Sequence, residues 1–322
     1  MTYREMGTTG VKLSNLVLGA WTLGDGNSRD DMTDESSIAA IHAAIDAGIN
    51  MIDTAEIYGG GRSEEIIGRA LKGRRDDIMV ATKVWRDNLT KEGVEKSLTA
   101  SLKRLGTDYV DVYQIHRPSD TVPIEETMGA LVEQQKKGRI RFLGVSNFSA
   151  AQMEEASKIA RFETSQPPYN LFWRFVEDED NPWCREHDVT VIPWSPLGQG
   201  ILSGKYDVDH PLPEGDGRNH NLVFMQPAFD VASQAIVRMR EISSDLGCTV
   251  AQLSLAWLIH QPGKVVPIAG PRTPEQLEGV LPAAELKLPE DVLCELDTLG
   301  NKVTDAVRKM PELWNIYEMW PK

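Results

Sequence analysis

Several features that define other classes of protein are missing from this sequence. Only three cysteines occur among its 322 residues, and Cys184, Cys248 and Cys294 form no C-x-x-C pair. An odd, scattered set argues against a disulfide framework and against a thiolate zinc site. The opening residues, MTYREMGTTG, lack the basic and then apolar pattern of a signal peptide. No apolar run approaches the roughly 18 residues of a membrane helix. We therefore expect a cytoplasmic protein that does not span a membrane.

Positive charge is also scarce. The chain has 34 Lys and Arg against 48 Asp and Glu, a formal net charge of −14. This balance argues against nucleic acids and anionic membranes as partners, because both attract basic surfaces. We expect a small-molecule partner instead, and any anionic part of it must be held by local cations or helix ends.

What the chain does contain is a regular alternation of short apolar runs and amphipathic stretches. Near-continuous apolar runs are typical of parallel strands covered on both faces. Strands are predicted at 16–21, 50–54, 78–84, 110–116, 140–146, 163–169, 189–195 and 265–270. Helices are predicted at 34–47, 63–72, 91–105, 123–137, 150–160, 231–246, 250–260, 274–281 and 289–299. The strand at 163–169 must be short, because Pro167 and Pro168 cannot donate to a ladder.

The repeat length defines the fold class. A strand, a crossover helix and the next parallel strand need about thirty residues, which is the repeat seen here. With no linker-like tract in the chain, residues 1–322 are predicted to form one α/β domain, a (β/α)8 TIM barrel. Residues 2–6 and 12–15 flank a glycine-bearing turn and predict an N-terminal β-hairpin that caps one end of the barrel.

Local signals mark several helix ends. Ser149, Thr249 and Thr273 each precede a glutamine by three residues, the pattern of a capping box. Glycines are predicted to close helices at Gly48, Gly106, Gly138, Gly247 and Gly300. The interval between Ser195 and the helix near 230 is rich in Gly, Pro, Asp and Asn. A loop of this length is usually functional, and we interpret it as a lid over a ligand.

Polar residues follow four of the predicted strands where each strand ends, which is where a β/α barrel carries its chemistry. Asp53, Lys83 and His116 stand at three such ends, and Tyr58 follows the first of them closely. A tyrosine donates a proton poorly at neutral pH, but a nearby ammonium lowers its pKa. Burying that lysine requires a paired carboxylate. The set therefore suits protonation of an alkoxide, with His116 orienting a carbonyl oxygen.

The sequence resembles the aldo-keto reductase superfamily. The resemblance is carried by IDTAEIYGGGRSEEIIGRAL (52–71), VATKVW (80–85), VDVYQIH (110–116), GRIRFLGVSNF (138–148), QPPYN (166–170), VIPWSPLGQGILSGKY (191–206) and VVPIAGPRTPEQL (265–277). These segments span the chain in the family's order. Among the branches, the chain looks most like bacterial reductases of inositol utilisation and general stress.

The resemblance implies a role for each matching residue. Tyr58 would be the general acid, tuned by Lys83 and Asp53, and His116 would bind the substrate oxygen. Ser146, Asn147 and Gln166 would hold the nicotinamide carboxamide, while Trp194 would stack on the nicotinamide ring. The implied reaction reduces an aldehyde or ketone, sugar-derived or aryl, to the alcohol by hydride transfer. The same resemblance admits a regulatory, redox-sensing protein with little turnover.

The remaining cofactor contacts combine the resemblance with residue chemistry. Ser195, Leu197 and Lys205 would wrap the pyrophosphate, since glycines there allow close backbone approach and Lys205 supplies charge. Gly270, Arg272 and Gln276 lead into a helix start, an arrangement that favours anions. In the family this position receives a 2′-phosphate, so NADP(H) is expected over NAD(H). No G-x-G-x-x-G opens a helix, so a Rossmann domain is not needed.

One position departs from the family. Many relatives have a Glu-Asn pair that contacts adenine, but here Gly279 follows Glu278, so that contact is not carried over.

Aromatic residues are predicted to shape the substrate pocket. The resemblance places Trp21 and Trp85 over the substrate, and Phe172 and Trp173 could add a further wall. The tail at 311–320 carries Trp314, Tyr317 and Trp320, which fit a stripe packed on the barrel, a flap or a subunit contact. The pattern defines neither the substrate nor whether the chain forms a homo-oligomer.

No metal is expected. The six histidines show no close pairing of the kind that metal ligands make, and Lys83 would repel a divalent cation.

Overall fold

A closed ring of parallel strands forms the centre of the molecule in the computed structural model, which describes residues 1–23 and 33–310. The ring strands are β3 (Val17–Gly19), β4 (Met51–Asp53), β5 (Met79–Val84), β6 (Val110–Ile115), β7 (Ile140–Ser146), β8 (Thr164–Gln166), β9 (Thr190–Val191) and β10 (Ile268–Ala269). They follow chain order from β3 to β9, with β10 beside β3. Backbone hydrogen bonds from Val191 to Lys264 and from Val266 to Val191 join the two ends. The predicted (β/α)8 TIM barrel is confirmed.

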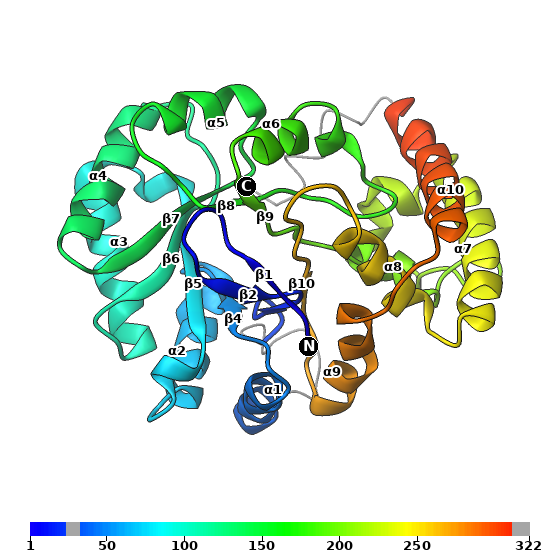
Figure 1. Cartoon of the computed structure of the whole chain (residues 1–322), viewed down its shortest axis with the longest axis horizontal. Helices are drawn as coiled ribbons and strands as arrows, with labels where there is room; N and C mark the ends of the chain where they lie inside the picture. The colour runs from blue at the N-terminus through cyan, green and yellow to red at the C-terminus, as the bar shows by residue number, and fades with distance from the viewer. Residues whose placement is uncertain (24–32, 311–322) are drawn as a thin grey trace.

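Helices surround the strands on the outside (Figure 1). They are α1 (Asp34–Asp46), α2 (Arg62–Ala70), α3 (Lys91–Leu105), α4 (Ile124–Lys136), α5 (Ala150–Ser157), α6 (Asp180–Glu186), α7 (Ala228–Asp245), α8 (Val250–Ile259), α9 (Pro274–Val280) and α10 (Glu290–Arg308). Neighbours in sequence are neighbours in space from α1 to α6 and again from α7 to α9, and α9 packs on α1. The last helix, α10, lies outside this ring against α7 (Figure 1). The short α6 is not among the predicted helices.

Most helix ends agree with the local signals. Ser149 and Thr249 form complete capping boxes at α5 and α8. At α9 only half of the box forms: Thr273 accepts from the backbone of Gln276, but the Gln276 side chain accepts from the backbone N–H of Arg272 instead. The prediction that Gly300 ends a helix is wrong, because α10 runs through it. A Cβ at Gly300 would stand 2.3 Å from the carbonyl oxygen of Leu171, so this glycine serves close packing.

The N-terminal hairpin closes one end of the barrel, as predicted. Strands β1 (Tyr3–Glu5) and β2 (Lys12–Ser14) pair antiparallel and lie across the middle of the ring in Figure 1. Met6 and Leu13 are fully buried in one apolar cluster with residues from the barrel strands, which include Val17, Met51 and Ile268. Apolar contact seals this end and leaves the opposite end for chemistry.

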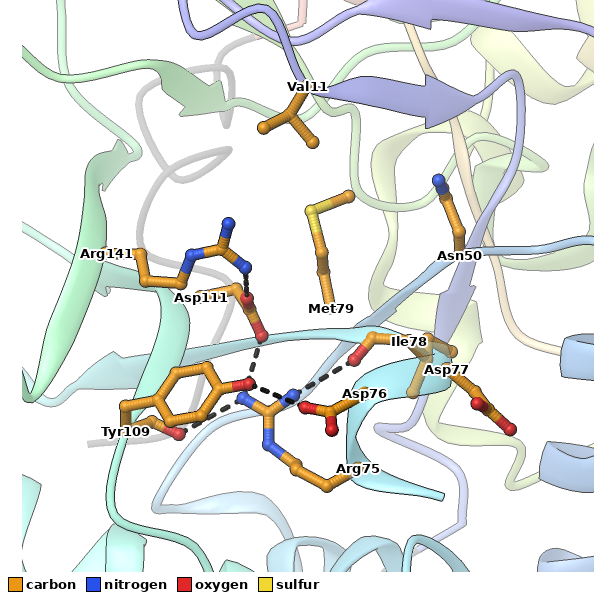
Figure 2. Close-up of a pocket in the computed structure, with 10 residues that line it drawn as sticks. All are labelled: Val11, Asn50, Arg75, Asp76, Asp77, Ile78, Met79, Tyr109, Asp111 and Arg141. Carbon is orange, nitrogen blue, oxygen red and sulfur yellow. Dashed lines mark hydrogen bonds and ion pairs between the residues drawn. The ribbon is translucent and has the colours of Figure 1, made fainter.

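Beside the hairpin, a charged cluster fills the N-terminal end of β5 and β6 (Figure 2). The carboxylate of Asp111, 1% exposed, accepts from Arg75 Nη2 at 2.8 Å and from Arg141 Nη1 at 2.6 Å. It also accepts from the backbone N–H of Val80 at 2.9 Å. The Arg75 guanidinium lies 4.2 Å from the centre of the Tyr109 ring. A cavity of about 200 Å³ adjoins this cluster. Because each charge in it is paired, we interpret the cluster as structural.

Prolines shorten the last strands relative to the sequence prediction. Strands β9 and β10 each pair over two residues, since Pro193 and Pro267 interrupt the runs predicted as 189–195 and 265–270. The long segment after Ser195 contains three short helices, η5 (Gly198–Ser203), η6 (Gly217–His220) and η7 (Leu222–Phe224). Its side chains Leu222 and Val223 are buried. The segment is therefore anchored on the barrel, and its role as a lid stays a prediction.

The aromatic tail with Trp314, Tyr317 and Trp320 lies outside the described residues. Within the described part of the chain, no single helix is long and apolar enough to cross a membrane. The helices α7 and α8 reach that threshold only together, by length and composition, across a bend of 89°.

Candidate active site

Four residues meet at the C-terminal end of the barrel, as the sequence predicts. Asp53 is the last residue of β4, Lys83 precedes the last residue of β5, and His116 directly follows β6. Tyr58 begins the short helix η1 (Tyr58–Gly61) that leads from β4 into α2. Parallel pairing of β4 with β5 and of β5 with β6 brings these strand ends to one edge. The barrel therefore converts residues far apart in sequence into one cluster.

The ammonium of Lys83 is the centre of the cluster. It is fully buried and donates to Asp53 Oδ2 at 2.7 Å, to the carbonyl oxygen of Thr54 at 2.8 Å and to Tyr58 Oη at 3.2 Å. An ammonium has three N–H donors, so all of them are used. A buried cation is tolerated when a carboxylate and further acceptors replace its water. Lys83 is thus held in place, and one of its donors points at a phenol oxygen.

The second oxygen of Asp53 is occupied as well. Asp53 Oδ1 accepts from Gln166 Nε2 at 2.8 Å and from Gln114 Nε2 at 3.2 Å. Both glutamines are buried in the barrel. Sequence reasoning assigned Gln166 to the cofactor and did not find Gln114. In the sequence, Gln114 within VDVYQIH is a polar residue in the middle of an apolar strand, and this is the signal that could have identified it.

The backbone near Tyr58 is shaped by three consecutive glycines. Gly59, Gly60 and Gly61 have φ values of 58°, 64° and 100°, in the left-handed region that side chains disfavour. Two residues after Gly61, Ser63 donates to the carbonyl oxygen of Ala20 and shares a hydrogen bond of 2.8 Å with Thr54. This turn places the Tyr58 hydroxyl over Lys83 while part of the side chain stays exposed at the mouth.

Burial governs the protonation states. Burial raises the pKa of Tyr58, and the Lys83 ammonium offsets this only in part, so the pKa lies above its ordinary value. The expectation that the pKa of Tyr58 would be lowered is therefore wrong for the protein alone, although Lys83 acts in the expected direction. Burial also opposes the charge of Lys83, but Asp53 and Tyr58 outweigh it and raise the pKa of Lys83. The site thus holds a protonated phenol beside a protonated amine.

His116 is neutral and lies close to Tyr58. Its burial, together with the charges of Lys83 and Arg117, lowers its pKa well below 6.5. Its ring meets the edges of Tyr58 and Trp85, at centroid distances of 5.8 and 5.0 Å. Among the described residues its buried Nδ1 has no hydrogen-bond partner. An unpaired buried nitrogen is costly, so it suits a ligand.

Two tryptophans stand near this mouth. Trp85 is partly buried beside His116, and Trp21, which follows β3, is 48% exposed. The other predicted wall does not form, because Phe172 and Trp173 are fully buried within the protein. Trp173 instead packs edge-on against Trp194, with ring centres 6.4 Å apart.

The residues predicted to hold the nicotinamide form one hydrogen-bonded chain. Trp194 Nε1 donates to Asn147 Oδ1 at 3.1 Å, and Asn147 Nδ2 donates to the carbonyl oxygen of His116 at 2.9 Å. Ser146 Oγ donates to the carbonyl oxygen of Gln166 at 2.8 Å. Asn147 has a φ of 59°, a strained conformation that often marks functional sites. The structure therefore brings Ser146, Asn147, Gln166 and Trp194 together beside the cluster around Lys83.

The segment predicted to wrap a pyrophosphate has an unusual backbone. Ser195 and Gln199 have φ values of 51° and 55°, and Gly198, Gly200 and Gly204 are also in the left-handed region. Leu197 is partly buried, and the side chain of Lys205 is exposed. Arg218 from the following segment donates to the carbonyl oxygen of Gln199 at 3.2 Å. Sequence reasoning missed Arg218, because only the fold brings it to this loop.

The predicted 2′-phosphate residues lie at the start of α9. Gly270 directly follows β10, and Arg272 precedes the cap residue Thr273. The side chain of Gln276 turns back to the backbone of Arg272, which fixes the approach to the helix. Another arginine, Arg174, forms ion pairs with Glu177 and with Asp297 of α10, at 2.9 Å each.

No group of three or more His, Cys, Asp or Glu residues that could hold a metal ion occurs within residues 1–23 and 33–310. The site instead contains hydrogen-bond donors that surround the phenol of Tyr58.

Comparison with known proteins agrees with this arrangement. A profile of the Aldo/keto reductase family matches residues 15–301. The aldo-keto reductase YhdN of Bacillus subtilis is 36% identical over 319 residues, which cover 95% of this chain and 96% of that protein. The chain belongs to the aldo-keto reductase family. Membership of this family makes it an oxidoreductase, and the resemblance to aldo-keto reductases seen in its motifs is confirmed.

Other relatives differ in what their names say. The NADH-specific methylglyoxal reductase of Escherichia coli is 32% identical over 88% of this chain and 93% of its own length. A probable voltage-gated potassium channel subunit beta of Arabidopsis thaliana is 34% identical over 89% of this chain and 92% of its own length.

Solved structures share the fold. The glycerol dehydrogenase AKR11B4 of Gluconobacter oxydans superposes with a TM-score of 0.85 at 32% identity, over 93% of this chain and 95% of that one. An aldo/keto reductase of Klebsiella pneumoniae in complex with NADP and acetate has a TM-score of 0.75 at 30% identity, over 91% and 93%. Nicotinamide dinucleotides are thus the cofactors named among the relatives.

Proposed function

We propose that this protein is an NADP(H)-dependent reductase that converts an aldehyde or ketone to the alcohol, with Tyr58 as the proton donor. The observation that carries the proposal is the three-way donation of the buried Lys83 ammonium to Asp53, Thr54 and Tyr58. A carbonyl oxygen gains negative charge as its carbon is reduced, and a phenol backed by an ammonium can protonate it.

The residues present fit a nicotinamide dinucleotide. Trp194 offers a partly exposed indole, and Asn147 offers an amide beside it. A Cβ on Gly200 would stand 3.1 Å from Arg218 Nη1, so the glycine lets this guanidinium lie close to the loop proposed to hold the pyrophosphate. Lys205 and Arg272 supply the positive charge that phosphates need. When bound, the reduced nicotinamide would supply hydride to the carbonyl carbon.

The side chains would divide the remaining work. The His116 ring lies beside Tyr58, its Nδ1 has no hydrogen-bond partner in residues 1–23 and 33–310, and a neutral imidazole can hydrogen-bond a carbonyl oxygen. Tyr58 would pass its proton to that oxygen as it becomes an alkoxide. Lys83 would stabilise the phenolate that results, and water at the mouth would restore the proton. Trp21 and Trp85 would flank the substrate and exclude part of that water.

Arg272 carries the proposed preference for NADP(H). A guanidinium is the side chain best suited to bind a phosphate in a bidentate manner. The NADP complex of the Klebsiella pneumoniae relative supports this choice, whereas the name of the Escherichia coli relative favours NADH. The preference therefore rests on Arg272 and requires a direct comparison of the two cofactors.

A second function is favoured by the resemblance to channel β subunits. A protein of that kind could keep the whole cluster around Lys83 and use the bound cofactor as a redox signal with little turnover. The two functions differ in rate. A regulatory subunit should oxidise NADPH very slowly with any carbonyl compound, whereas a metabolic reductase should turn over.

The test is to measure the reduction of a panel of carbonyl compounds by the loss of NADPH absorbance. Aldoses, keto-sugars and aryl aldehydes, including 4-nitrobenzaldehyde, are assayed in parallel with NADPH and with NADH. Turnover near the common enzymatic range of about 1–1000 s⁻¹ on at least one compound supports the reductase. Tight NADPH binding without turnover on any member of the panel would favour the regulatory protein instead.

A further inference from the structure

We infer that Gln114 is a positioning residue for the proton donor, acting through Asp53. This inference deepens the proposed function and rests on it. It concerns a residue that touches neither the phenol nor the mouth, but lies one step behind Lys83 inside the barrel. Its importance follows from how the Asp53 carboxylate is held.

The carboxylate of Asp53 has two oxygens with separate tasks. Oδ2 accepts from Lys83 at 2.7 Å, and Oδ1 accepts from the side-chain amides of Gln114 and Gln166. A carboxylate bound at one oxygen can still rotate about its last bond. With donors on both oxygens its plane is set, and so is the direction in which Lys83 is pulled. The geometry of the Lys83 ammonium toward Tyr58 therefore depends on the amides.

The two amides are not equivalent. Gln166 sits on β8, on the opposite side of the barrel from β4, and its amide reaches across the interior to Asp53. Gln166 also belongs to the set proposed to meet the nicotinamide, so a bound cofactor would compete for it. Gln114, on β6, is fully buried beneath the site. It is the amide that can stay on Asp53 while Gln166 serves the cofactor.

The barrel is built to admit the Gln114 side chain. In register, Gln114 pairs with Gly144 of β7, and Gly144 pairs with Thr164 of β8. A Cβ on Gly144 would stand 2.3 Å from Thr164 Oγ1 and 2.8 Å from Gln114 Cγ. Thr164 Oγ1 in turn donates to Gln114 Oε1 at 3.4 Å. The missing side chain at 144 thus provides the space in which Gln114 is oriented with its amide N–H toward Asp53.

The experiment compares Gln114→Met with wild type. Methionine keeps the length and volume but removes the donor. We expect kcat for an aldehyde to fall about 10-fold to 100-fold, because a hydrogen bond to a charged group is lost. The Kd for NADPH, read from quenching of tryptophan fluorescence, should change less than about twofold. Gln166→Met should weaken NADPH as well, which separates the two amides.

A second variant tests the proton on residue 114. In Gln114→Glu, a buried carboxyl group would lie against Asp53, and the pair would share a proton. The charged group that contacts residue 114 is Asp53, which is itself paired with Lys83. The protonated glutamic acid can replace the amide donor, so activity should be retained at low pH and lost as pH rises. Loss of activity at every pH would show that a hydrogen-bond donor at residue 114 does not support Asp53.

Gln134→Met is the matched control. Gln134 is a buried glutamine on α4, and it accepts from Arg139 at 2.8 Å far from Asp53 in the fold. Its replacement should lower stability and leave kcat unchanged. If Gln114→Met keeps kcat within twofold of wild type, or loses activity only in step with stability as Gln134→Met does, the inference is wrong.

A crystal structure of Gln114→Met separates this inference from the proposed function. We expect the Asp53 carboxylate to rotate and the distance from Lys83 Nζ to Tyr58 Oη to exceed 3.2 Å. Unchanged geometry would overturn the inference even if wild type reduces aldehydes well. Lack of turnover in wild type would instead count against the proposed function, while the geometry would still decide the role of Gln114.

Discussion

The two ends of the barrel carry similar parts arranged for different purposes. Each has a buried carboxylate, a cation paired with it, and a tyrosine whose ring lies under that cation. At the N-terminal end these are Asp111, Arg75 and Tyr109, and at the C-terminal end they are Asp53, Lys83 and Tyr58. The difference lies in what the cation donates to and in what is left over.

At the N-terminal end of the barrel, the cation donates to acceptors of the protein itself. Arg75 donates to Asp111 and to the carbonyl oxygens of Ile78 and Tyr109, and the Tyr109 hydroxyl donates to exposed Asp76 (Figure 2). At the other end, Lys83 donates directly to a phenol oxygen, and Nδ1 of the neighbouring His116 has no hydrogen-bond partner within the part of the chain that the structure describes. Charges paired within the protein stabilise the barrel, while an ammonium that donates to a phenol hydroxyl can support proton transfer.

The largest difference between the two ends is expected in how much each tyrosine contributes to kcat. We expect Tyr58→Phe to lower kcat for aldehyde reduction by at least about 1000-fold, because the proton donor is lost, while NADPH still binds. Tyr109→Phe is the control, since it removes a phenol hydroxyl at the opposite end and should leave kcat unchanged. Steady-state assays of both variants decide the matter. Near-normal turnover by Tyr58→Phe would remove Tyr58 as the donor.

Loss of the Asp111 carboxylate, at the N-terminal end of the barrel, should lower the stability of the protein and leave catalysis unchanged. Asp111→Asn leaves Arg75 half-buried without its ion pair, and we expect the free energy of unfolding to fall by about 2–4 kcal/mol. Chemical denaturation measures this, and kcat should remain within about twofold of wild type. Asp76→Asn, at an exposed carboxylate, should cost less than about 1 kcal/mol. A large drop in kcat for Asp111→Asn at temperatures where it is folded would contradict the division between the two ends.

The proposed phosphate site should discriminate between cofactors. We expect Arg272→Ala to raise the Kd for NADPH roughly 10-fold to 100-fold, since one charged hydrogen-bond donor to phosphate is removed. The Kd for NADH should change little. Fluorescence titration of both cofactors with the same preparations provides the measurement. Equal losses for NADPH and NADH would show that Arg272 does not bind the 2′-phosphate.

The smallest effect is expected from pH across the neutral range. The pKa of His116 is lowered, so its ring is already neutral there, and the pKa of Tyr58 is raised, so its phenol is still protonated. Both shifts move titration out of the range from about pH 6.5 to about 10. The kcat for reduction should therefore be nearly flat in that range and decline above it, as the phenol ionises. An inflection near pH 6.5 would show that His116 titrates during catalysis.

Much of the fold and the site could be predicted because the signals are local. The apolar runs are long enough to define strands, and the polar residues directly after them meet once the strands are parallel. Asp53, Lys83 and His116 were found in this way, and Tyr58 lies close behind Asp53 along the chain. Residues such as Ser149 and Thr249 marked helix starts correctly because a cap involves only neighbours in sequence.

The wrong predictions concern residues whose environment is formed by segments distant in the sequence. Gly300 looked like a helix terminator, but it is needed for contact with Leu171, which lies 129 residues earlier in the numbering. Phe172 and Trp173 looked like pocket walls, but the fold buries them. The direction of the Tyr58 pKa shift was also wrong, because the burial around a phenol cannot be read from its sequence neighbours.

The barrel, its family and the side chains around the proposed proton donor all follow from the amino-acid sequence alone. The reason is that the repeat length and the residues at the strand ends are local features of the chain. Only the tertiary structure decided which hydrogen bonds those side chains make. It placed Gln166 on Asp53 from across the barrel, and it put Gln114 behind them in the space left by Gly144. Such contacts depend on distances across a closed sheet, which no local pattern encodes.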